Sequence, residues 1–568
     1  MRAPSRRGFL KAHCGAGLAA YAGPRAGAPP AIWCEEPQRR VFPQSLGEFK
    51  GQPRVELEAC RGERVPVQLA FRSGKRCEGV AARLELRSPD VAWRTRAVGL
   101  VPCQELGMLT PDPLLDAGTL DLEAGQSRSL WLDIEVPPET KAGHYAGVIQ
   151  VDAGRQRLAS IPLALDVLDA RLPEPLQTDF YLSIWQDPGA IARYRRVPLW
   201  SGEHWRLIEA YAADSARYGQ KTITATVVED PWASQTGYPF PSMVVWRYPG
   251  EWSLGGARRF SFDYTVFDRY VETYLRRGIR IVNCFSPSHW GAFAYYDEAA
   301  GKTRYRKYAL GDPWYAEAWN QFLPDLIGHL KRRNWLAQAY LAMDEAPAET
   351  MEKVWPILRR YSSDLKIHLA GGGGRYGDEA EDLCYYYFDL QHNKAAFPRP
   401  DPEARRREGK RTTFYVCTGP THPNTFLYSP AYGSRMLPWL VWKYGYDGFL
   451  RWALNSWPDR VWEQPRYRWG SGDMFLIYPG QSGPLDSMRW ELLFAGIQDY
   501  QCLKAVGDRL CERERSGMRP DVLKQHRDEV AAAVALATGN EDPLITYNES
   551  HIARARRRVN RVLAKLVS

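Results

Sequence analysis

The feature that most constrains the fold is a regular alternation of short apolar runs and amphipathic stretches across residues 178–510. Short runs rich in β-branched and aromatic residues, bounded by turn residues, predict strands. Eight such runs are FYLSIW (180–185), TITATVV (222–228), IRIVNCF (279–285), AYLAM (339–343), KIHLAG (366–371), LCYYYF (383–388), TFYVC (413–417) and GFLRWAL (448–454). Helical spacing recurs between most of them, for example at 203–218, 312–333, 347–361 and 433–444. Eight strands alternating with helices favour a (β/α)8 barrel of the TIM type over an open sheet.

The segments on either side of this alternation have different patterns. Residues 40–170 contain short β-branched runs such as VPVQLAF, SLWLDIEV, YAGVIQV and IPLALDV, which predict a β-sandwich. DARLPEPLQ (169–177) has the composition of a linker, and residues 511–568 are predicted to be helical. We therefore expect a multidomain α/β protein with a sandwich (40–170), a catalytic barrel (178–510) and a helical C-terminal segment (511–568).

The N-terminus resembles an export signal. SRRGFLK at 5–11 precedes a small-residue apolar stretch, and Ala20-Tyr21-Ala22 is a candidate cleavage site. Residues 1–30 are thus interpreted as a twin-arginine signal region, which predicts a periplasmic or secreted protein. No later run approaches the length of a membrane span.

Charge and cysteine content exclude several classes of function. A net charge of +9 is modest for 568 residues, so it does not point to nucleic acid. RARRRVNR (554–561) lies among apolar residues at helical spacing and is interpreted as the solvated face of a helix, with a binding patch as the alternative. No CxxC or HExxH motif occurs, so we expect no metal and no cofactor. Cys60, Cys77 and Cys103 could pair after export.

Two adjacent carboxylates stand out in YLAMDEAP (340–347). Asp344 and Glu345 close the fourth predicted strand, just before the predicted helix at 347–361. The carboxyl ends of strands are where α/β barrels carry their sites. The alternative is that the two acids only favour the positive end of the next helix.

The chain resembles glycoside hydrolase family 123 and its larger relatives across roughly residues 40–510. The resemblance is carried by LSIWQDP, ITATVVEDPW, the AMDEAP turn, FYVCTGP, WLVWKYGYDGFLRWALNSW, and GDMFLIYPG followed by SMRWELLFAGIQDYQCL. It implies a sandwich followed by a barrel and an exo-acting β-N-acetylgalactosaminidase. It also implies that the adjacent acids on the fourth strand, Asp344 and Glu345, are catalytic.

The chemistry of such a pair differs from that of ordinary retaining glycosidases, in which one of two facing carboxylates attacks the sugar. In common retaining barrels this nucleophile ends the seventh strand, but here that strand ends CTGPTHP. A 2-acetamido sugar can supply its own nucleophile and form an oxazoline-like intermediate. We then expect Glu345 to act as the acid/base and Asp344 to orient the acetamide.

Further polar and aromatic residues near predicted strand ends are candidates for binding a glycan or glycoconjugate. The 21 Trp, 31 Tyr and 19 Phe suit sugar ligands. The candidates are Trp185, Gln186, Glu229, Trp232, Tyr387, Asp389, Asn455, Trp457, Asp473 and Tyr478. An acetamide needs an apolar slot and a hydroxyl donor, so Trp457 is expected to form a wall and Tyr387 or Tyr478 to supply the hydroxyl.

Two alternatives remain open from the sequence. One is a two-carboxylate glycosidase acting on a sugar without an acetamide, with Glu229, Asp389 or Asp473 as the second group. The other is a non-catalytic carbohydrate-binding protein that has kept the barrel. The galacto or gluco preference, the aglycone and the oligomeric state are also left open.

Overall fold

Two groups of secondary structure divide the chain in a computed structural model that describes residues 30–47, 52–86, 91–289, 291–361, 363–371, 376–387, 399–539 and 549–567. The first unit comprises residues up to Gly99, Leu114–Leu172 and Cys502 onward. The second comprises Leu100–Pro113 and Pro173–Gln501. The signal region predicted at 1–30 lies, apart from its last residue, outside the described residues.

The first unit contains two five-stranded sheets, with the strand orders β1-β3-β8-β5-β6 and β2-β10-β9-β4-β7. Alternate residues of both sheets, such as Leu69 and Leu132 in one and Ile149 and Leu163 in the other, enter one hydrophobic core. The strands are β1 (Ala31–Glu35), β2 (Val55–Arg61), β3 (Arg64–Arg72), β4 (Cys77–Leu86), β5 (Ala92–Cys103), β6 (Met108–Leu115), β7 (Thr119–Leu122), β8 (Ser127–Glu135), β9 (Gly143–Ala153) and β10 (Gln156–Arg171).

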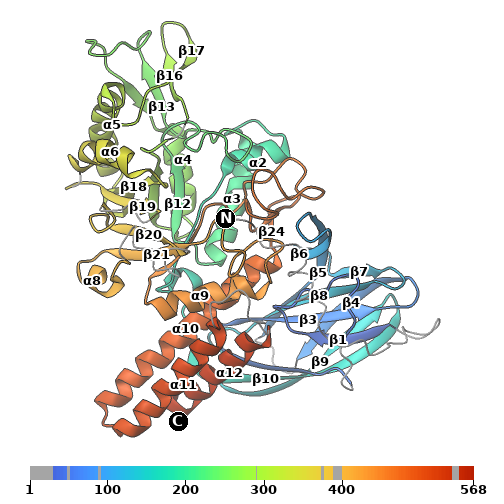
Figure 1. Cartoon of the computed structure of the whole chain (residues 1–568). Helices are drawn as coiled ribbons and strands as arrows, with labels where there is room; N and C mark the ends of the chain where they lie inside the picture. The colour runs from blue at the N-terminus through green and yellow to red at the C-terminus, as the bar shows by residue number, and fades with distance from the viewer. Residues whose placement is uncertain are drawn as a thin grey trace, which may run out of the picture. The chain divides into compact units, whose positions relative to one another are not determined.

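Helices α11 (Pro520–Thr538) and α12 (Ser550–Val567) also belong to the first unit and pack side by side (Figure 1). The apolar face of α12 is buried, as its periodicity predicts. Its arginine cluster is only partly solvated, because the buried Arg556 donates to both oxygens of Glu63, at 2.8 and 2.7 Å. Arg554, Arg557 and Arg561 are exposed.

Cys60, Cys77 and Cys103, which could pair according to the sequence, form no disulfide among the described residues. Cys60 Sγ instead lies 3.7 Å from Cys502 Sγ in the first unit, and both are free thiols. Together with Glu63 they form a group of candidate metal ligands within 4.8 Å of one another. The Arg556 guanidinium already occupies both carboxylate oxygens of Glu63.

The second unit is built on a parallel sheet of eight strands, with the order β11-β22-β21-β20-β19-β18-β15-β12. The two ends of this order meet, since Leu182 of β11 bridges to Gln220 just before β12, and the Lys221 N–H donates to the Leu182 carbonyl at 2.9 Å. The sheet is therefore barrel-like. Its strands are β11 (Tyr181–Ile184), β12 (Thr222–Thr226), β15 (Ile281–Phe285), β18 (Ala339–Met343), β19 (Lys366–Ala370), β20 (Asp382–Tyr386), β21 (Arg411–Tyr415) and β22 (Gly448–Arg451).

Helices separate most of these strands, and capping residues fix several of their starts. Ser201 accepts from the His204 N–H at 3.3 Å, and Asp312 from the Tyr315 N–H at 2.9 Å. The helices are α2 (Pro188–Arg195), α3 (Gly202–Arg217), α4 (Thr265–Leu275), α5 (Pro313–Arg332), α6 (Ala348–Arg359), α8 (Pro402–Arg407), α9 (Tyr432–Tyr444) and α10 (Met488–Arg515), with 3₁₀ turns η1 (Pro175–Gln177) and η2 (Leu336–Gln338).

A smaller sheet, which the sequence pattern did not predict, is inserted after the second and third strands. It has the order β14-β13-β16-β17, built from Val245–Tyr248 (β13), Ser261–Asp263 (β14), Phe293–Asp297 (β16) and Lys302–Arg306 (β17). A two-stranded ribbon pairs β23 (Tyr478–Pro479) with β24 (Pro484–Leu485).

Among the described helices, none combines the length and apolar character that a membrane span requires.

Candidate active site

Asp344 and Glu345 directly follow β18, whose residues are all buried. Helix α6 starts at Ala348, so the pair occupies a short turn between strand and helix. The Asp344 side chain is half-buried, and Glu345 is exposed. The backbone N–H of Glu345 donates to Asp344 Oδ1 at 2.8 Å. One carboxylate is thus held deep at the end of the sheet, and the other faces the solvent.

The pKa of Asp344 is far from the ordinary value of an aspartate. Burial, together with the neighbouring Glu345 carboxylate, raises the pKa of Asp344 to about 7. The Glu345 N–H and the Trp232 side chain act in the opposite direction but do not cancel the effect. Asp344 therefore exchanges its proton near neutral pH. Perturbed carboxylates of this kind concentrate at functional sites.

An aromatic cluster adjoins Asp344. Trp185, the first residue after β11, stacks on Trp232 with ring centroids 5.3 Å apart. Phe285, at the end of β15, contacts both indoles at 4.7 and 5.5 Å. These rings belong to one buried cluster with Ala342 of β18 and Tyr415 of β21. The rings form an apolar wall beside the carboxylates.

Glu345 is held from the opposite side by Tyr415, the last residue of β21. The Tyr415 hydroxyl donates to Glu345 Oε1, and the Tyr386 ring stacks on Tyr415 at 5.2 Å. Gly371 adjoins the same carboxylate: a Cβ there would lie 2.8 Å from Glu345 Cγ, and its φ of +96° favours glycine. Tyr415 at the end of the seventh strand and Gly371 after the fifth strand therefore both contact Glu345.

The loop that carries Trp232 has a strained backbone. Asp230, Ala233 and Ser234 have φ values of 46°, 49° and 53°, a region that L-residues rarely adopt. The Asp230 carboxylate accepts from the Ser234 N–H and hydroxyl, at 2.8 and 2.7 Å. Such strain persists only when surrounding contacts enforce it, and it clusters at ligand sites. Here the contacts place Trp232 against Trp185.

Two of the amide side chains predicted from the sequence bind backbone instead. Gln186 accepts from the Thr224 N–H at 2.8 Å and donates to the Ile184 carbonyl, which ties β11 to β12. Asn455 forms two bonds with the backbone of Asp187, at 2.9 and 2.8 Å. Both side chains are buried, and they connect strand ends and loops.

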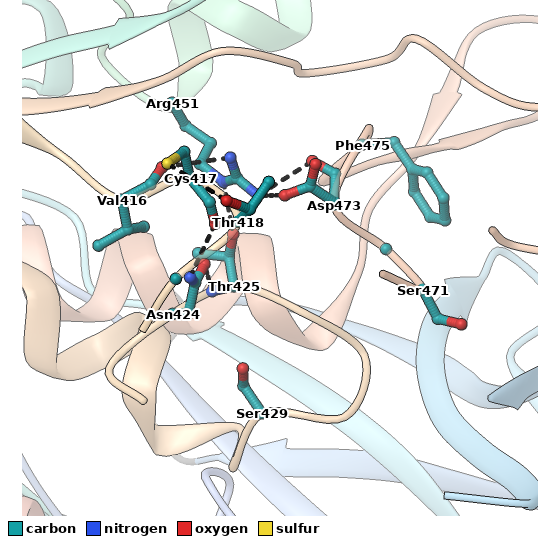
Figure 2. A network of polar contacts seen from close by, with 12 residues as sticks. Val416, Cys417, Thr418, Asn424, Thr425, Ser429, Arg451, Ser471, Asp473 and Phe475 are labelled. Atoms are coloured by element: carbon teal, nitrogen blue, oxygen red, sulfur yellow. Dashed lines mark hydrogen bonds and ion pairs between the residues drawn. The ribbon is translucent and has the colours of Figure 1, made fainter. Parts of the chain in front are cut away.

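Three further candidates lie in the interior of the second unit. Trp457 donates to the Ile477 carbonyl at 2.7 Å, and the Tyr478 hydroxyl donates to Asp112 Oδ2 at 2.9 Å. Asp473 pairs with Arg451, whose guanidinium also donates to the Val416 carbonyl and Thr425 Oγ1, at 3.2 and 3.0 Å (Figure 2). Both charged side chains are fully buried, so this network joins the loops after β21 and β22.

The remaining candidates fall in different places. Tyr387 is buried against Phe414, with ring centroids 5.4 Å apart, and its neighbour Tyr386 is the tyrosine that reaches Tyr415. Glu229, half-buried on the loop after β12, accepts from the Tyr305 hydroxyl at 2.9 Å. Asp389 lies outside the described residues.

Sequence reasoning missed Tyr415 and Gly371 as neighbours of Glu345, and Tyr386 as the ring that stacks on Tyr415. A signal for the two tyrosines existed in the period of two along a strand. Cys384 and Tyr386 share one face of β20, and Cys384 lies in the same buried cluster as Tyr415. Which face points inward was not evident from LCYYYF, because both faces of a buried strand are apolar.

Comparisons with known proteins place this geometry in a family. The sequence profile of "Glycoside hydrolase 123, catalytic domain" matches residues 185–506, which is more than half of the chain. A family 123 glycoside hydrolase from Clostridium perfringens, studied for the details of glycolipid glycan hydrolysis, has a similar fold. It aligns with a TM-score of 0.78 at 21% identity, over 95% of this chain and 98% of that chain.

Two other solved structures align far less well. They are a family 39 glycoside hydrolase from Bacteroides cellulosilyticus (TM-score 0.32, 10% identity, 78% of this chain and 81% of that chain) and a GH5 xyloglucanase from Bacteroides ovatus (0.29, 10%, 78% and 98%). No match was found among curated proteins. From the matched catalytic domain, the chain belongs to glycoside hydrolase family 123 and is an enzyme that acts on glycosides.

Proposed function

We propose that the protein is an exo-acting, retaining hydrolase of terminal β-linked N-acetylhexosamine, with N-acetylgalactosamine as the preferred sugar. Catalysis is assisted by the substrate and passes through an oxazoline-like intermediate. The observation that carries the proposal is the adjacent pair Asp344–Glu345, with a tyrosine, Tyr415, ending the seventh strand. A nucleophilic carboxylate occupies this strand end in common retaining barrels.

Asp344 is assigned to the acetamide. Its half-buried carboxyl beside Trp185 and Trp232 suits a group that carries a methyl and an N–H. As the acetamide oxygen attacks the anomeric carbon, positive charge develops on the nitrogen. An opposite charge nearby favours the ionised form of a carboxyl. Asp344, with a pKa raised to about 7, can therefore give its proton to solvent and, as a carboxylate, stabilise the intermediate.

Glu345 is assigned as the acid/base. It is exposed and has the longer side chain, so it can reach the glycosidic oxygen. The Tyr415 hydroxyl donates to Glu345 Oε1, and the lack of a side chain at Gly371 leaves room for Glu345 Cγ. Together these two neighbours fix the orientation of the Glu345 side chain. In the proposed step Glu345 donates a proton to the leaving oxygen, while the Asp344 carboxylate accepts from the acetamide N–H.

The alternative with two conventional carboxylates is less well supported. Asp473 is fully buried and paired with Arg451, so it cannot attack a sugar from its place in the structure. Glu229 accepts from Tyr305 and sits on the loop after the second strand. Neither residue faces Glu345 across the sheet in the way that Tyr415 does.

The wider context of the proposal comes from the family and the N-terminus. The similar Clostridium perfringens enzyme was studied for glycolipid glycan hydrolysis, which makes a glycolipid or another glycoconjugate the substrate class to test first. We also propose the family's β-sandwich and complete (β/α)8 TIM-type barrel as the architecture.

SRRGFLK is proposed to direct twin-arginine export. Precursor should then accumulate in the cytoplasm when Arg6 and Arg7 are replaced by Lys, whereas unchanged export would remove that assignment.

The test of mechanism uses an aryl β-N-acetylgalactosaminide with three readouts. NMR of the first product should show the β-anomer, because two inversions retain configuration. A thiazoline mimic of the intermediate should inhibit far more strongly than the free sugar. The 2-hydroxy analogue should be nearly inert. Mass spectrometry after a 2-fluoro glycoside is added decides the alternative, since a stable adduct on Glu229, Asp389 or Asp473 would overturn substrate assistance.

A further inference from the structure

We propose that a hollow beside helix α12 in the first unit binds phosphate groups, more than one at a time. The hollow has a volume of about 420 Å³, which is within the range of small-ligand sites. It is called the arginine hollow below, and its lining residues are Glu58 of β2 and, from α12, Arg554, Arg557, Arg558 and Arg561. The inference goes beyond the proposed function, because it involves neither the catalytic pair nor the cleaved sugar.

The spacing of the four arginines places them on one face of α12. Residues three, four and seven positions apart are neighbours on a helix surface. From Arg554 to Arg561 the row extends about 10 Å along the helix axis, which is long enough to meet more than one phosphate group. Like charges at this spacing repel one another, so the row does not stabilise the helix by itself.

Other basic residues of α11 and α12 have a carboxylate partner. Arg527 lies 2.7 Å from Glu514, and Lys565 lies 3.7 Å from Glu529. In the part of the chain that the structure describes, none of the four arginines of the hollow forms an ion pair with a carboxylate. Their donors are therefore open to a ligand, which is not the usual arrangement on this helical hairpin.

Neighbouring contacts hold α12 in place without using the four arginines. Asn560 donates to Glu58 Oε2 at 2.9 Å, so the one carboxylate of the hollow is bound to an amide. Arg556 donates to both oxygens of Glu63, and Val559 is fully buried. The helix is thus a fixed base for the guanidinium groups, and Glu58 offsets only one of their four charges.

The chemistry of the hollow matches phosphate. A guanidinium stays charged at physiological pH and can donate two parallel hydrogen bonds to phosphate oxygens. The positive field already acts on the start of α12, where burial and the charge of Arg554 lower the pKa of His551. Several guanidinium groups around one concave surface favour a multiply charged anion over a neutral ligand.

A second hollow shows that the excess of positive charge is local. It has a volume of about 650 Å³ and shares Arg558 and Arg561 with the arginine hollow. Its lining also includes three carboxylates, those of Asp521, Asp528 and Glu529. Positive and negative groups are therefore mixed on the side of α12 that faces α11, and the phosphate site is assigned to the side that faces Glu58.

The experiment measures binding of two phosphate probes to the full chain. Calorimetry with inorganic pyrophosphate tests a soluble source of phosphate. Cosedimentation with vesicles of phosphatidylglycerol and phosphatidylcholine in equal parts tests lipid headgroups, with vesicles of phosphatidylcholine alone as the reference. In Arg557→Gln/Arg561→Gln the affinity should fall at least about tenfold, because hydrogen bonds to charged groups are of this order.

The control removes two positive charges elsewhere in the same unit. Arg83 of β4 and Arg94 of β5 are exposed and pair with Asp152 and Asp116. Arg83→Gln/Arg94→Gln should bind both probes as wild type does. If this control loses as much affinity as the variant of the hollow, the binding reports only net charge and the arginine hollow is overturned.

The two probes also identify the source of the phosphate. Loss of pyrophosphate binding in Arg557→Gln/Arg561→Gln supports a soluble ligand, and loss of vesicle binding alone supports lipid headgroups. Failure of wild type to bind either probe, or equal affinities of wild type and variant for both, would overturn the proposal. Circular dichroism checks that the variant is folded. If it is not, Arg557→Lys/Arg561→Lys, which loses the paired donors, decides, and wild-type affinity in it would overturn the site.

Discussion

The second unit contains two carboxylates in loops that follow barrel strands, Asp473 and Asp344. They differ in the charge of the side chain beside them. After β22, Asp473 meets the Arg451 guanidinium, and both side chains are fully buried (Figure 2). After β18, the charged group that acts on Asp344 is a second carboxylate, Glu345. The first pair joins two loops. In the second, burial and the neighbouring like charge raise the pKa of Asp344.

The comparison teaches how to tell a structural acid from a reactive one in a single fold. Opposite charges in a low dielectric favour their ionised forms, whereas like charges and burial favour protonation of one member. In the structural pair, the Arg451 guanidinium binds both Asp473 Oδ1 and the Asp473 backbone carbonyl, the latter at 3.0 Å. Reactive groups keep an open side for a ligand, as Glu345 does.

The largest effect is expected from the proposed catalytic pair, Asp344 and Glu345. Glu345→Gln keeps the shape and removes the proton donor, and general acid catalysis contributes roughly 10²–10⁴-fold. The loss in kcat should be greatest for poor leaving groups and smaller for aryl glycosides. Asp344→Asn should slow both classes, because it acts on formation of the intermediate. Steady-state kinetics on both substrate classes measures this. A leaving-group dependence confined to the Asp344 variant would reverse the two assignments.

Breaking the buried ion pair should instead reduce stability. Arg451→Met leaves Asp473 buried without its cation, which typically costs about 3–5 kcal/mol. Urea unfolding followed by tryptophan fluorescence gives the difference. The exposed pair Arg206–Glu203, with N and O 2.6 Å apart, offers a matched control, since exposed ion pairs contribute little. Loss of activity with unchanged stability in Arg451→Met would contradict the structural role of this pair.

The pH dependence of stability should differ between wild type and Asp344→Asn. Because the pKa of Asp344 in the folded protein is raised to about 7, the folded chain binds this proton more tightly than the unfolded chain does. Its stabilising contribution is therefore complete below about pH 4 and is lost as the pH rises toward 7. Relative to the Asn variant, wild type should lose roughly 1–4 kcal/mol of unfolding free energy across this range. A difference that is constant with pH would contradict the raised pKa.

The smallest effect is expected where Tyr415 orients Glu345. Tyr415→Phe retains the ring and removes the donor to Glu345 Oε1, so kcat should fall roughly tenfold, as expected for a hydrogen bond to a charged group. Tyr386→Phe is the control, because its hydroxyl donates only weakly to the Gly419 carbonyl at 3.3 Å. Equal kcat values for the two variants would remove Tyr415 from the positioning of the acid.

The alternation of strands and helices, and the strand-to-helix turn that carries the pair, could be predicted from the sequence. Both depend on hydrophobic periodicity and turn residues, which are features of the local sequence. All eight predicted strands occur, with ends that coincide or are shifted by up to three residues, and Pro347 precedes α6 instead of starting it. The inserted sheet β14-β13-β16-β17 was missed because its strands are short and polar residues interrupt them.

Most of the supporting site residues could not be predicted, because proximity to a strand end does not say which way a side chain points. Tyr387 and Tyr386 are adjacent, yet only Tyr386 stacks on Tyr415. Trp457 and Tyr478 look like ligand-binding aromatics in NSWPDR and FLIYPG, but their polar atoms bond to Ile477 and Asp112. Those partners, 20 and 366 residues away in the chain, are invisible to local patterns.

The central claim, that the substrate's own acetamide is the nucleophile on this pair, is tested most directly by fluorinating that acetamide. Aryl β-N-acetylgalactosaminides with mono-, di- and trifluoroacetyl groups have progressively less nucleophilic carbonyl oxygens. The account predicts that log kcat/KM falls steeply and linearly with the electron-withdrawing power of the acyl group, and that the slope persists in Tyr415→Phe. Rates independent of fluorination would contradict it and would assign the attack to a carboxylate of the protein.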